Sequence, residues 1–255
     1  MKVITLINQK GGAGKTTLAR ALLSAADEEG LRAAFIDCDQ TENLSKWAFR
    51  ASQESGWSDR IEGFQTLDAQ EASGIVEALE DQGRTELVIV DTAGDASSDH
   101  DVFVGLADLV LIPVFLTESD IEIALGTAQY LFRLRQRVDD PGSLPNCRVV
   151  LNKVSTRPSR SDLLLLERIR DEKLVGDGSS EPIEKLTLLS AVLQDREAYK
   201  IMDKQGLLGR VLKRHNQNAI DENKRFTRNP KYLVNCLEET KMLLSLCMQE
   251  GQKDG

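Results

Sequence analysis

The chain has 255 residues and a net charge of −9, with 41 acidic and 32 basic side chains. This length fits one large domain or two small ones. The acidic excess excludes a protein that coats nucleic acid with its whole surface, although it leaves room for a local basic patch. Hydrophobic residues make up 41% of the chain, so a wholly disordered protein is also excluded.

The sequence predicts neither a membrane span nor a disulfide framework. Its long runs without a charge, such as Leu109–Thr117, are far shorter than the ~20 apolar residues of a spanning helix. The first residues lead directly into a strand-like run rather than a signal peptide. The cysteines form no C-x-x-C pair, and we expect buried thiols in a cytoplasmic protein at Cys38, Cys147, Cys236 and Cys247.

In chain order, short aliphatic runs alternate with longer helical patterns, as in a parallel sheet with crossover helices. The runs are continuously apolar, which is typical of strands buried on both faces. We predict strands at Val3–Ile7, Ala33–Asp37, Leu87–Asp91, Leu109–Val114 and Arg148–Leu151, with a further strand at Leu186–Leu189 and a short edge strand at Ile61–Leu67.

Helical spacing of apolar residues fills the intervals between these strands. The first helix is predicted over Thr16–Glu29, because Gly30 is a typical residue just past a helix end. Capping boxes predict helix starts at two further points, Asp68 with Glu71 and Ser119 with Glu122. A fourth helix is predicted over Ser161–Lys173.

Beyond Arg196 the strand pattern stops, and two or three helices follow, the last from about Pro230 to Met248. We therefore predict one α/β domain over residues 1–255, with a doubly wound, mainly parallel sheet and helices on both faces. Residues 1–199 form its core, and residues 200–255 form a helical C-terminal part.

A glycine-rich loop stands between the first predicted strand and the first predicted helix. Glycine permits φ values closed to other residues, so backbone N–H groups approach phosphate oxygens, and the following helix N-terminus favours anions. Lys15 is placed to reach the β- and γ-phosphates, and the Thr16 hydroxyl to ligate Mg²⁺. Gln9 replaces the first glycine of the usual pattern. The loop predicts a nucleotide site formed by Lys10, Gly11, Gly12, Ala13, Gly14, Lys15, Thr16 and Thr17.

Acidic residues end two of the predicted strands, Asp37 and Asp39 after one and Asp91 after the other. In an open parallel sheet, ligands bind outside the carboxyl ends of the strands. Asp91 is therefore predicted to hold Mg²⁺ through water, with Asp37 supporting the metal shell. Asp39 is placed to orient the water that attacks the γ-phosphate.

Residues 10–17, 37–40 and 88–94 together resemble the deviant Walker ATPases of the ParA/MinD superfamily. The resemblance covers roughly residues 1–206, and the first motif is highly specific to that superfamily. It implies an ATP-dependent dimer with the nucleotides sandwiched at the interface. In such a dimer, Lys10 would cross to the phosphates bound by the partner subunit.

Further segments are similar to the ParA branch, namely residues 112–121, 149–153 and 195–206. The second of these implies that Asn152 contacts adenine. The motifs depart from the family pattern at two points: the proline that usually follows Asp39 is missing, and residues 92–95 lack the proline common in that segment. With these departures the chain resembles ParA-like proteins of conjugative DNA transfer as much as plain partition proteins.

Basic residues gather between Lys200 and Lys231, where nine bases and three acids give a net charge of +6. Residues 232–255 carry −2, which leaves −13 on residues 1–199. This segregation suits a contact with the DNA phosphate backbone, although a solvated helical face has the same pattern. Because a ParA-like protein is expected to bind DNA nonspecifically through C-terminal bases, the candidates are Lys200, Lys204, Arg210, Lys213, Arg214, Lys224, Arg225 and Arg228.

The leading prediction is a cytoplasmic, Mg²⁺-dependent ATPase that dimerises with ATP and then binds nucleoid DNA nonspecifically, so that it partitions or positions plasmid DNA. Its expected partner is a centromere-binding or relaxosome-type adaptor that stimulates hydrolysis. An accessory ATPase of conjugative DNA transfer is an alternative.

Two other classes are weighed against this prediction. A MinD-like membrane-surface switch would use Tyr232–Met248 as an amphipathic anchor, but Glu238 and Glu239 lie there and such anchors are normally basic. A membrane partner is therefore not expected. A redox relative with a metal cluster would need cysteines near Asp91, and the nearest are Cys38 and Cys147.

Overall fold

The computed structural model describes residues 1–94, 100–171, 173–175, 182–185, 187–221 and 230–250. The predicted DNA contacts at Lys224, Arg225 and Arg228 lie outside the described residues.

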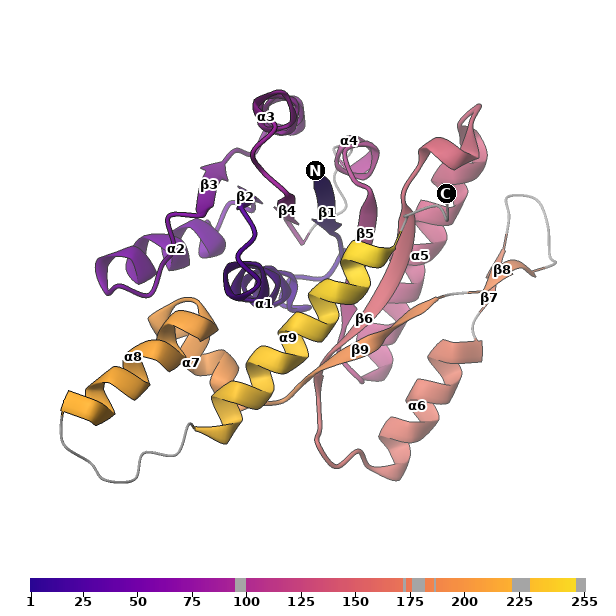
Figure 1. The fold of residues 1–255 in the computed structure, drawn as a ribbon. Coiled ribbons are helices and arrows are strands. Elements are labelled where there is room, and N and C mark those ends of the chain that lie inside the picture. Colours follow the sequence, from indigo (N-terminus) through magenta and orange to yellow (C-terminus); the bar gives the residue numbers. More distant parts are fainter. Residues whose placement is uncertain (95–99, 172, 176–181, 186, 222–229, 251–255) are drawn as a thin grey trace.

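Seven strands form one sheet in the order β3-β2-β4-β1-β5-β6-β9 (Figure 1). Every neighbouring pair is parallel. The predicted doubly wound α/β fold is therefore confirmed. The strands are β1 (Lys2–Leu6), β2 (Ala33–Cys38), β3 (Ile61–Gln65), β4 (Leu87–Thr92), β5 (Leu109–Val114), β6 (Asn146–Val154) and β9 (Leu188–Gln194).

The central strand β1 lies between β4 and β5. From β1 the chain first builds one half of the sheet, through β2, β3 and β4, and then the other half, through β5, β6 and β9. The strand order therefore reverses beside β1, and a crevice for a ligand opens at such a point. A separate antiparallel pair joins β7 (Lys173–Val175) to β8 (Pro182–Lys185).

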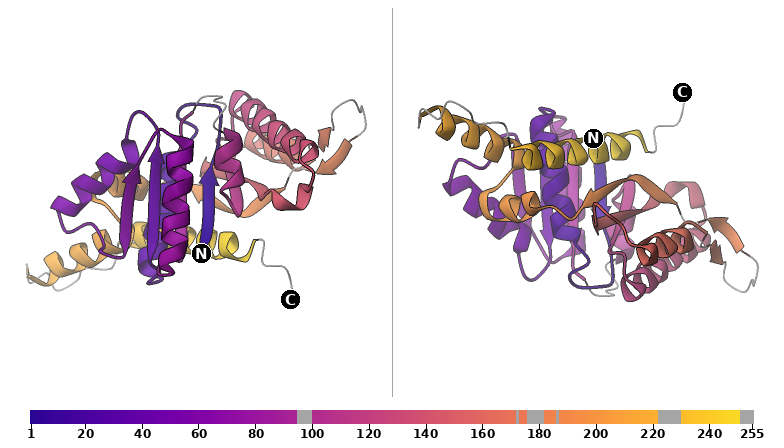
Figure 2. Two further views of the ribbon diagram at one scale, coloured as in Figure 1. Left: turned by 90° about the horizontal axis from the view of Figure 1, so that it is seen from above. Right: turned by 90° about the horizontal axis from the view of Figure 1, so that it is seen from below.

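Helices cover both faces of this sheet (Figures 1 and 2). Those on one face share a single apolar core with β1, β2 and β4, and they are α1 (Lys15–Glu28), α2 (Asn43–Gln53), α7 (Glu197–Gln205), α8 (Leu208–Asp221) and α9 (Lys231–Gln249). Those on the other face are α3 (Ala69–Gln82), α4 (His100–Gly105), α5 (Glu118–Arg137) and α6 (Arg160–Asp171). A 3₁₀ turn, η1 (Pro141–Ser143), leads from α5 to β6. Because helices cover both faces of the sheet, every residue of β2, β4 and β5 is buried.

Some helix and strand ends differ from the sequence prediction. Asp68 caps α3 as predicted, accepting from two backbone amides of the first turn at 2.8 and 3.2 Å. The box predicted over Ser119–Glu122 is wrong, because Thr117 caps α5 and its hydroxyl accepts from the Asp120 amide at 3.2 Å. The last strand begins at Leu188, two residues later than predicted, and is longer.

The sequence did not predict α2, whose buried face consists of Leu44, Trp47 and Ala51. Its local sequence has no side-chain cap of its own. The carboxylate of Asp37, at the end of β2, instead accepts from the amides of Leu44 and Ser45 at 3.1 and 2.8 Å. A cap that comes from another segment leaves no signal at the helix start.

The apolar face of α9 packs into the core against α1 and β9, where Leu233, Leu237, Leu243 and Leu244 are buried. Arg148 holds the far end of the helix, because its guanidinium donates to both carboxylate oxygens of Glu250 at 2.8 Å. Within the described part of the chain, no helix is long and apolar enough to cross a bilayer. The face that a membrane anchor would need is thus already occupied by the protein core.

An ion pair between Arg210 and the buried carboxylate of Asp27 fixes α8 to α1. Arg210 donates to the two carboxylate oxygens of Asp27 at 2.8 and 2.9 Å and to the Ser58 hydroxyl at 2.9 Å. Burial raises the pKa of Asp27, but the bonds from Arg210 and Ser58 outweigh it, and the pKa lies below its usual value. Arg210, a predicted DNA contact, therefore has a structural partner.

We expect the substitution Arg210→Met to lower the free energy of unfolding by about 3 kcal/mol, because it leaves the buried Asp27 carboxylate without its main partner. The loss should be full at neutral pH and should shrink as pH falls through the depressed pKa of Asp27, since the pair stabilises only the ionised form. Urea unfolding at several pH values measures it. Lys204→Met, at an exposed position of the neighbouring α7, is the control and should change little.

Candidate nucleotide site at the carboxyl edge of the sheet

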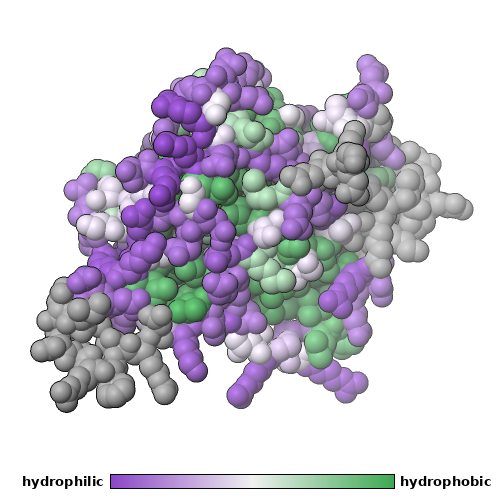
Figure 3. Space-filling view, in the orientation of Figure 1, coloured by the Kyte–Doolittle hydropathy of each residue, from purple (hydrophilic) through white to green (hydrophobic). Residues whose placement is uncertain are grey.

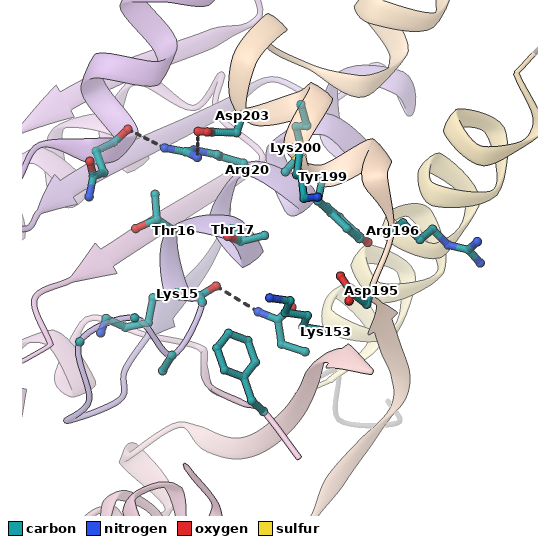
Figure 4. A pocket seen from close by; sticks show the side chains of 18 of the residues that line it. Lys15, Thr16, Thr17, Arg20, Lys153, Asp195, Arg196, Tyr199, Lys200 and Asp203 are labelled. Carbon is teal, nitrogen blue, oxygen red and sulfur yellow. Dashed lines mark hydrogen bonds and ion pairs between the residues drawn. The ribbon is translucent and has the colours of Figure 1, made fainter. Parts of the chain in front are cut away.

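The carboxyl ends of the central strands open into a cavity of about 850 Å³. The predicted glycine-rich loop forms its floor, together with the first turn of α1. Figure 4 shows Lys15, Thr16 and Thr17 on this side, facing Tyr199 and Lys200 across the cavity. The topology thus brings the predicted loop to the point where an open parallel sheet binds its ligands.

The loop is braced from below by Asn8, a buried residue that sequence reasoning missed. Its side-chain amide donates to the Pro113 carbonyl at 2.8 Å, and its side-chain oxygen accepts from the Lys10 amide at 2.9 Å. The Lys15 ammonium donates to the Asn8 carbonyl at 3.1 Å. These bonds hold Lys15 along the loop, inside the mouth of the pocket.

At two positions of this site the backbone passes so close to other atoms that only glycine fits. Gly14 has φ of 93°, and a Cβ there would lie 2.2 Å from the side-chain nitrogen of Asn152. That amide donates to the Gly14 carbonyl at 3.3 Å. Gly94, just after β4, passes so close to the loop that a Cβ would lie 2.8 Å from the Gly11 backbone. Asn152, predicted to contact adenine, thus lines the cavity and also braces the loop.

Asp91 ends β4 directly behind this loop and is 1% exposed. Burial raises the pKa of Asp91 to about 7, with Asp37 adding to the rise, while the nearby Thr16 hydroxyl and Lys15 oppose it. Neither carboxylate oxygen has a hydrogen bond of regular geometry to the described residues. A buried carboxylate with unsatisfied oxygens beside a threonine hydroxyl fits a Mg²⁺ site, since hard cations take oxygen ligands.

The other two predicted acids have partners of their own. Asp37 caps α2 and accepts from the Asp39 amide at 3.3 Å, and burial raises its pKa. Asp39 lines the cavity, and its carboxylate accepts from the amide and hydroxyl of Thr41 at 2.8 and 2.5 Å. The described residues contain no group of three or more His, Cys, Asp or Glu arranged to hold a metal.

Lys10, the second lysine of the loop, points toward α5. Its ammonium forms an ion pair at 2.9 Å with Asp120, whose side chain is 6% exposed. The hydroxyl of Thr117 also contacts the Asp120 carboxylate. The lysine predicted to act across a dimer interface is therefore held within its own chain.

The opposite wall of the cavity comes from residues 194–203, and most of it was missed. Gln194, Asp195, Arg196, Tyr199, Lys200 and Asp203 line the cavity. Arg196 is tied to α9, because its Nε donates to Glu239 at 2.6 Å. Only the similarity of residues 195–206 to a ParA segment signalled this wall in the sequence.

The predicted DNA contacts that the structure describes fall on α7 and α8. Four of these five form ion pairs with acids of the same chain: Lys200 with Glu197 (2.8 Å), Arg210 with Asp27 (2.8 Å), Lys213 with Glu28 (3.2 Å) and Arg214 with Glu54 (3.9 Å). Lys204 is exposed.

The sequence is similar to those of known proteins. The family model described as VirC1 protein matches residues 1–250. Protein virC1 of Rhizobium radiobacter is 28% identical over 210 residues, which cover 82% of this chain and 83% of that protein.

Solved structures of low sequence identity share the fold. The MinC:MinD cell division protein complex of Aquifex aeolicus matches with a TM-score of 0.61 at 16% identity, covering 96% of both chains. The septum site-determining protein MinD of Pyrococcus horikoshii OT3, complexed with Mg-ADP, matches with a TM-score of 0.59 at 13% identity, covering 97% of this chain and 99% of that one. The chain therefore has the fold of MinD/ParA-type P-loop ATPases.

We expect Asp91→Asn to stabilise the protein in EDTA at alkaline pH. Because the pKa of Asp91 in the folded chain is raised to about 7, ionising this buried carboxyl opposes folding, and the native carboxyl is tolerated best at low pH. The free energy of unfolding of the variant should therefore equal that of the wild type below about pH 4. The difference in favour of the variant should grow as pH rises and level off above pH 7 at no more than about 4 kcal/mol.

Thermal unfolding from pH 4 to pH 8 measures this difference. Addition of Mg²⁺ with ADP should reverse the ranking at pH 8, since the variant lacks the charged ligand. Asp39→Asn removes a carboxylate that already has hydrogen-bond partners and serves as the control. A variant no more stable than wild type at pH 8 would contradict the burial argument.

Proposed function

The chain belongs to the VirC1 protein family, and we propose that it is a Mg²⁺-dependent ATPase of the ParA branch that dimerises with ATP. The observation that carries this proposal is the buried, unsatisfied carboxylate of Asp91 behind the glycine loop. That loop opens α1 at the switch point of a parallel sheet. The Mg-ADP bound by a MinD protein of the same fold supports a nucleotide in this cavity.

The nucleotide would lie with its phosphates on the loop. The backbone amides of residues 11–17 and the N-terminal end of α1 would face the phosphate oxygens, and Lys15 would offset their charge. Asn152 and the wall at residues 194–203 would enclose the nucleoside, since both line the same cavity. Thr16 and Asp91 would hold Mg²⁺, which supplies charge neutralisation on the phosphates.

Hydrolysis requires a water aligned with the bond to the γ-phosphate. Asp39 is the proposed residue for this task, because it lines the cavity and is half-buried. Its bonds to Thr41 fix the direction of the carboxylate. Asp37 contributes indirectly, because it holds the start of α2 and with it the segment that carries Asp39 and Thr41.

Dimerisation would place Lys10 on the phosphates of the partner subunit, and it requires this side chain to leave Asp120. One third of the Lys10 side chain is exposed, so part of it already faces the outside of the chain. An apolar patch near the same edge of the sheet supports self-association. Leu163 and Leu164, at the start of α6, are 49% and 58% exposed. Figure 3 shows hydrophobic surface among hydrophilic surface on the side of the molecule where α6 lies, and exposed apolar patches mark interaction surfaces.

The proposed role of the ATP-bound dimer is to bind nucleoid DNA nonspecifically and to position plasmid DNA, or to assist its conjugative transfer. A centromere-binding or relaxosome-type adaptor would stimulate hydrolysis and so release the protein into the cytoplasm. The pairing of four candidate bases shifts the proposed DNA contact toward Lys204 and the segment carrying Lys224, Arg225 and Arg228. The membrane-surface alternative gains no support, because the apolar face of α9 is buried.

Gel filtration with ATP, ADP or no nucleotide tests the dimer. We expect the wild-type chain to elute as a dimer only with ATP and Mg²⁺. Lys10→Ala should retain nucleotide binding but remain a monomer with ATP, because the group that spans the interface is lost. Asp120→Asn, which frees Lys10 without removing it, is the matched control and should still dimerise. A Lys10→Ala variant that dimerises fully with ATP would disprove the sandwich arrangement.

Charge reversal tests the DNA contact. The combined change of Lys204, Lys224, Arg225 and Arg228 to Glu should abolish retention on DNA in low salt with ATP, while leaving basal ATP hydrolysis unchanged. Binding should also fall steeply with salt in the wild type, since phosphate contacts release counterions. Arg84→Glu, an exposed cation just before β4 at the opposite edge of the sheet, is the control. Unchanged retention in the multiple variant would remove this surface from the proposal.

A further inference from the structure

A row of polar side chains runs along one face of α1, at every third or fourth position. It consists of Thr16, Arg20, Ser24 and Asp27, and we name it the α1 row. This spacing places its members on one side of a helix. Arg20, Ser24 and Asp27 are 8%, 0% and 4% exposed. Buried polar groups are normally bonded, so the partners of the row show what it holds in place.

Each member of the α1 row contacts a different part of the fold. Thr16 lies beside Asp91 at the cavity. Arg20 joins the start of α2 to α7, and the Ser24 hydroxyl accepts from the amide of Leu208, the first residue of α8, at 3.2 Å. Asp27 binds Arg210 further along α8. One side of the phosphate-binding helix is thus bonded in sequence to α2, α7 and α8.

Within the row, Arg20 contacts two separate walls of the cavity. It donates to the Asn43 carbonyl at 2.8 Å and forms an ion pair with Asp203 on α7. Figure 4 shows Arg20 reaching Asp203 on the side of the cavity beyond Thr16 and Thr17. Arg20, Asn43 and Asp203 all line the cavity together with Thr41. The guanidinium therefore links the segment after Asp39 to the wall formed by α7.

The surroundings of Arg20 restrict it to this position. Its guanidinium lies 5.4 Å from the ring centroid of Trp47, and the Trp47 indole N–H donates to the Met202 carbonyl on α7 at 2.7 Å. The Arg20 side chain is nine-tenths buried, and its Nε has no hydrogen-bond partner among the described residues. Burying a cation with an unsatisfied donor costs free energy. Packing alone therefore does not explain why an arginine stands at this position.

We propose that Arg20 is a positioning residue for nucleotide binding, which holds the Thr41–Asn43 segment and α7 against the phosphate-binding end of α1. The inference rests on the proposed nucleotide function. It specifies how the wall at residues 194–203 is held in position relative to the glycine loop. Binding residues work only within a narrow range of geometry, and residues behind them set that range. Arg20 acts through Asn43 and Asp203, and it contacts no reacting atom.

Arg20→Met tests the proposal, because it keeps the aliphatic packing on Trp47 but removes the three-element link. Its loss leaves no buried charge behind, since the Asp203 side chain is 57% exposed. We expect the dissociation constant for ATP with Mg²⁺ to rise about tenfold, which is about 1.4 kcal/mol. KM should rise in parallel, while kcat changes less than about twofold, because a lost binding contact raises KM alone.

The matched control is Arg50→Met. Arg50 lies 3.8 Å from the same carboxylate oxygen of Asp203, but it is half-exposed and does not line the cavity. ATP affinity should therefore stay within the error of the wild-type value. Arg20→Lys should recover part of the affinity, since it keeps the charge beside Asp203 but loses the planar fork that also reaches Asn43.

Hydrogen exchange of the protein without nucleotide gives a second readout. The amides of Leu44, Ser45 and Leu208 should exchange faster in Arg20→Met and at the wild-type rate in Arg50→Met. If Arg20→Met does not fold, Asp203→Asn, at an exposed carboxylate, should show a smaller shift of the same sign in both measurements. Wild-type exchange and wild-type ATP affinity in the folded variant would overturn the role of Arg20. Failure of the wild-type chain to bind ATP would instead overturn the proposed function, and the exchange rates would still decide the positioning role.

Discussion

The buried carboxylate of Asp91 is the constraint on which the rest of the site depends. Removing a carboxylate from water costs several kcal/mol, and here the cost falls at the meeting point of β1, β2 and β4. The apolar strands around it provide the stability that tolerates such a group. Gly94 then lets the backbone beyond Asp91 touch the glycine loop, so the carboxylate lies directly behind the loop that lines the cavity. A bulkier residue at position 94 would push the loop away, because a Cβ there would lie 2.8 Å from the Gly11 backbone.

Helix α1, which follows the loop, is buried on nearly every side. Its apolar residues, among them Leu18, Leu22 and Leu23, pack into the main core between the sheet and α9. The α1 row occupies the remaining side, and each buried member is bonded to another element. A helix with leucine and alanine all round would bury as much of its surface, but it would lack the bonds to α2 and α7 beside the cavity. The polar row therefore provides specificity of position rather than additional burial.

The fold and the floor of the site could be predicted from the sequence, whereas most of its walls could not. Strands such as Leu109–Val114 are continuous aliphatic runs, and the loop at residues 10–17 is a local motif. The aliphatic runs and the loop motif can each be recognised from residues that are close together in the sequence. The start of α2 depends on Asp37, which belongs to another element. Similarly, the role of Arg20 depends on Asp203, 183 residues away. Partners brought together only by the tertiary fold leave no periodic or local pattern.

The charge segregation along the chain changes meaning once the structure is known. The segment from Lys200 to Lys231 carries +6 and the preceding residues carry −13, which suggested one basic face. In space, acids of the body approach that segment, since Glu28 and Asp27 of α1 pair with Lys213 and Arg210. The bases of α8 therefore serve first to attach the helix to an acidic neighbour. The proposed DNA contact would draw mainly on the bases that remain, and its salt dependence would then correspond to fewer phosphates than nine lysines and arginines suggest.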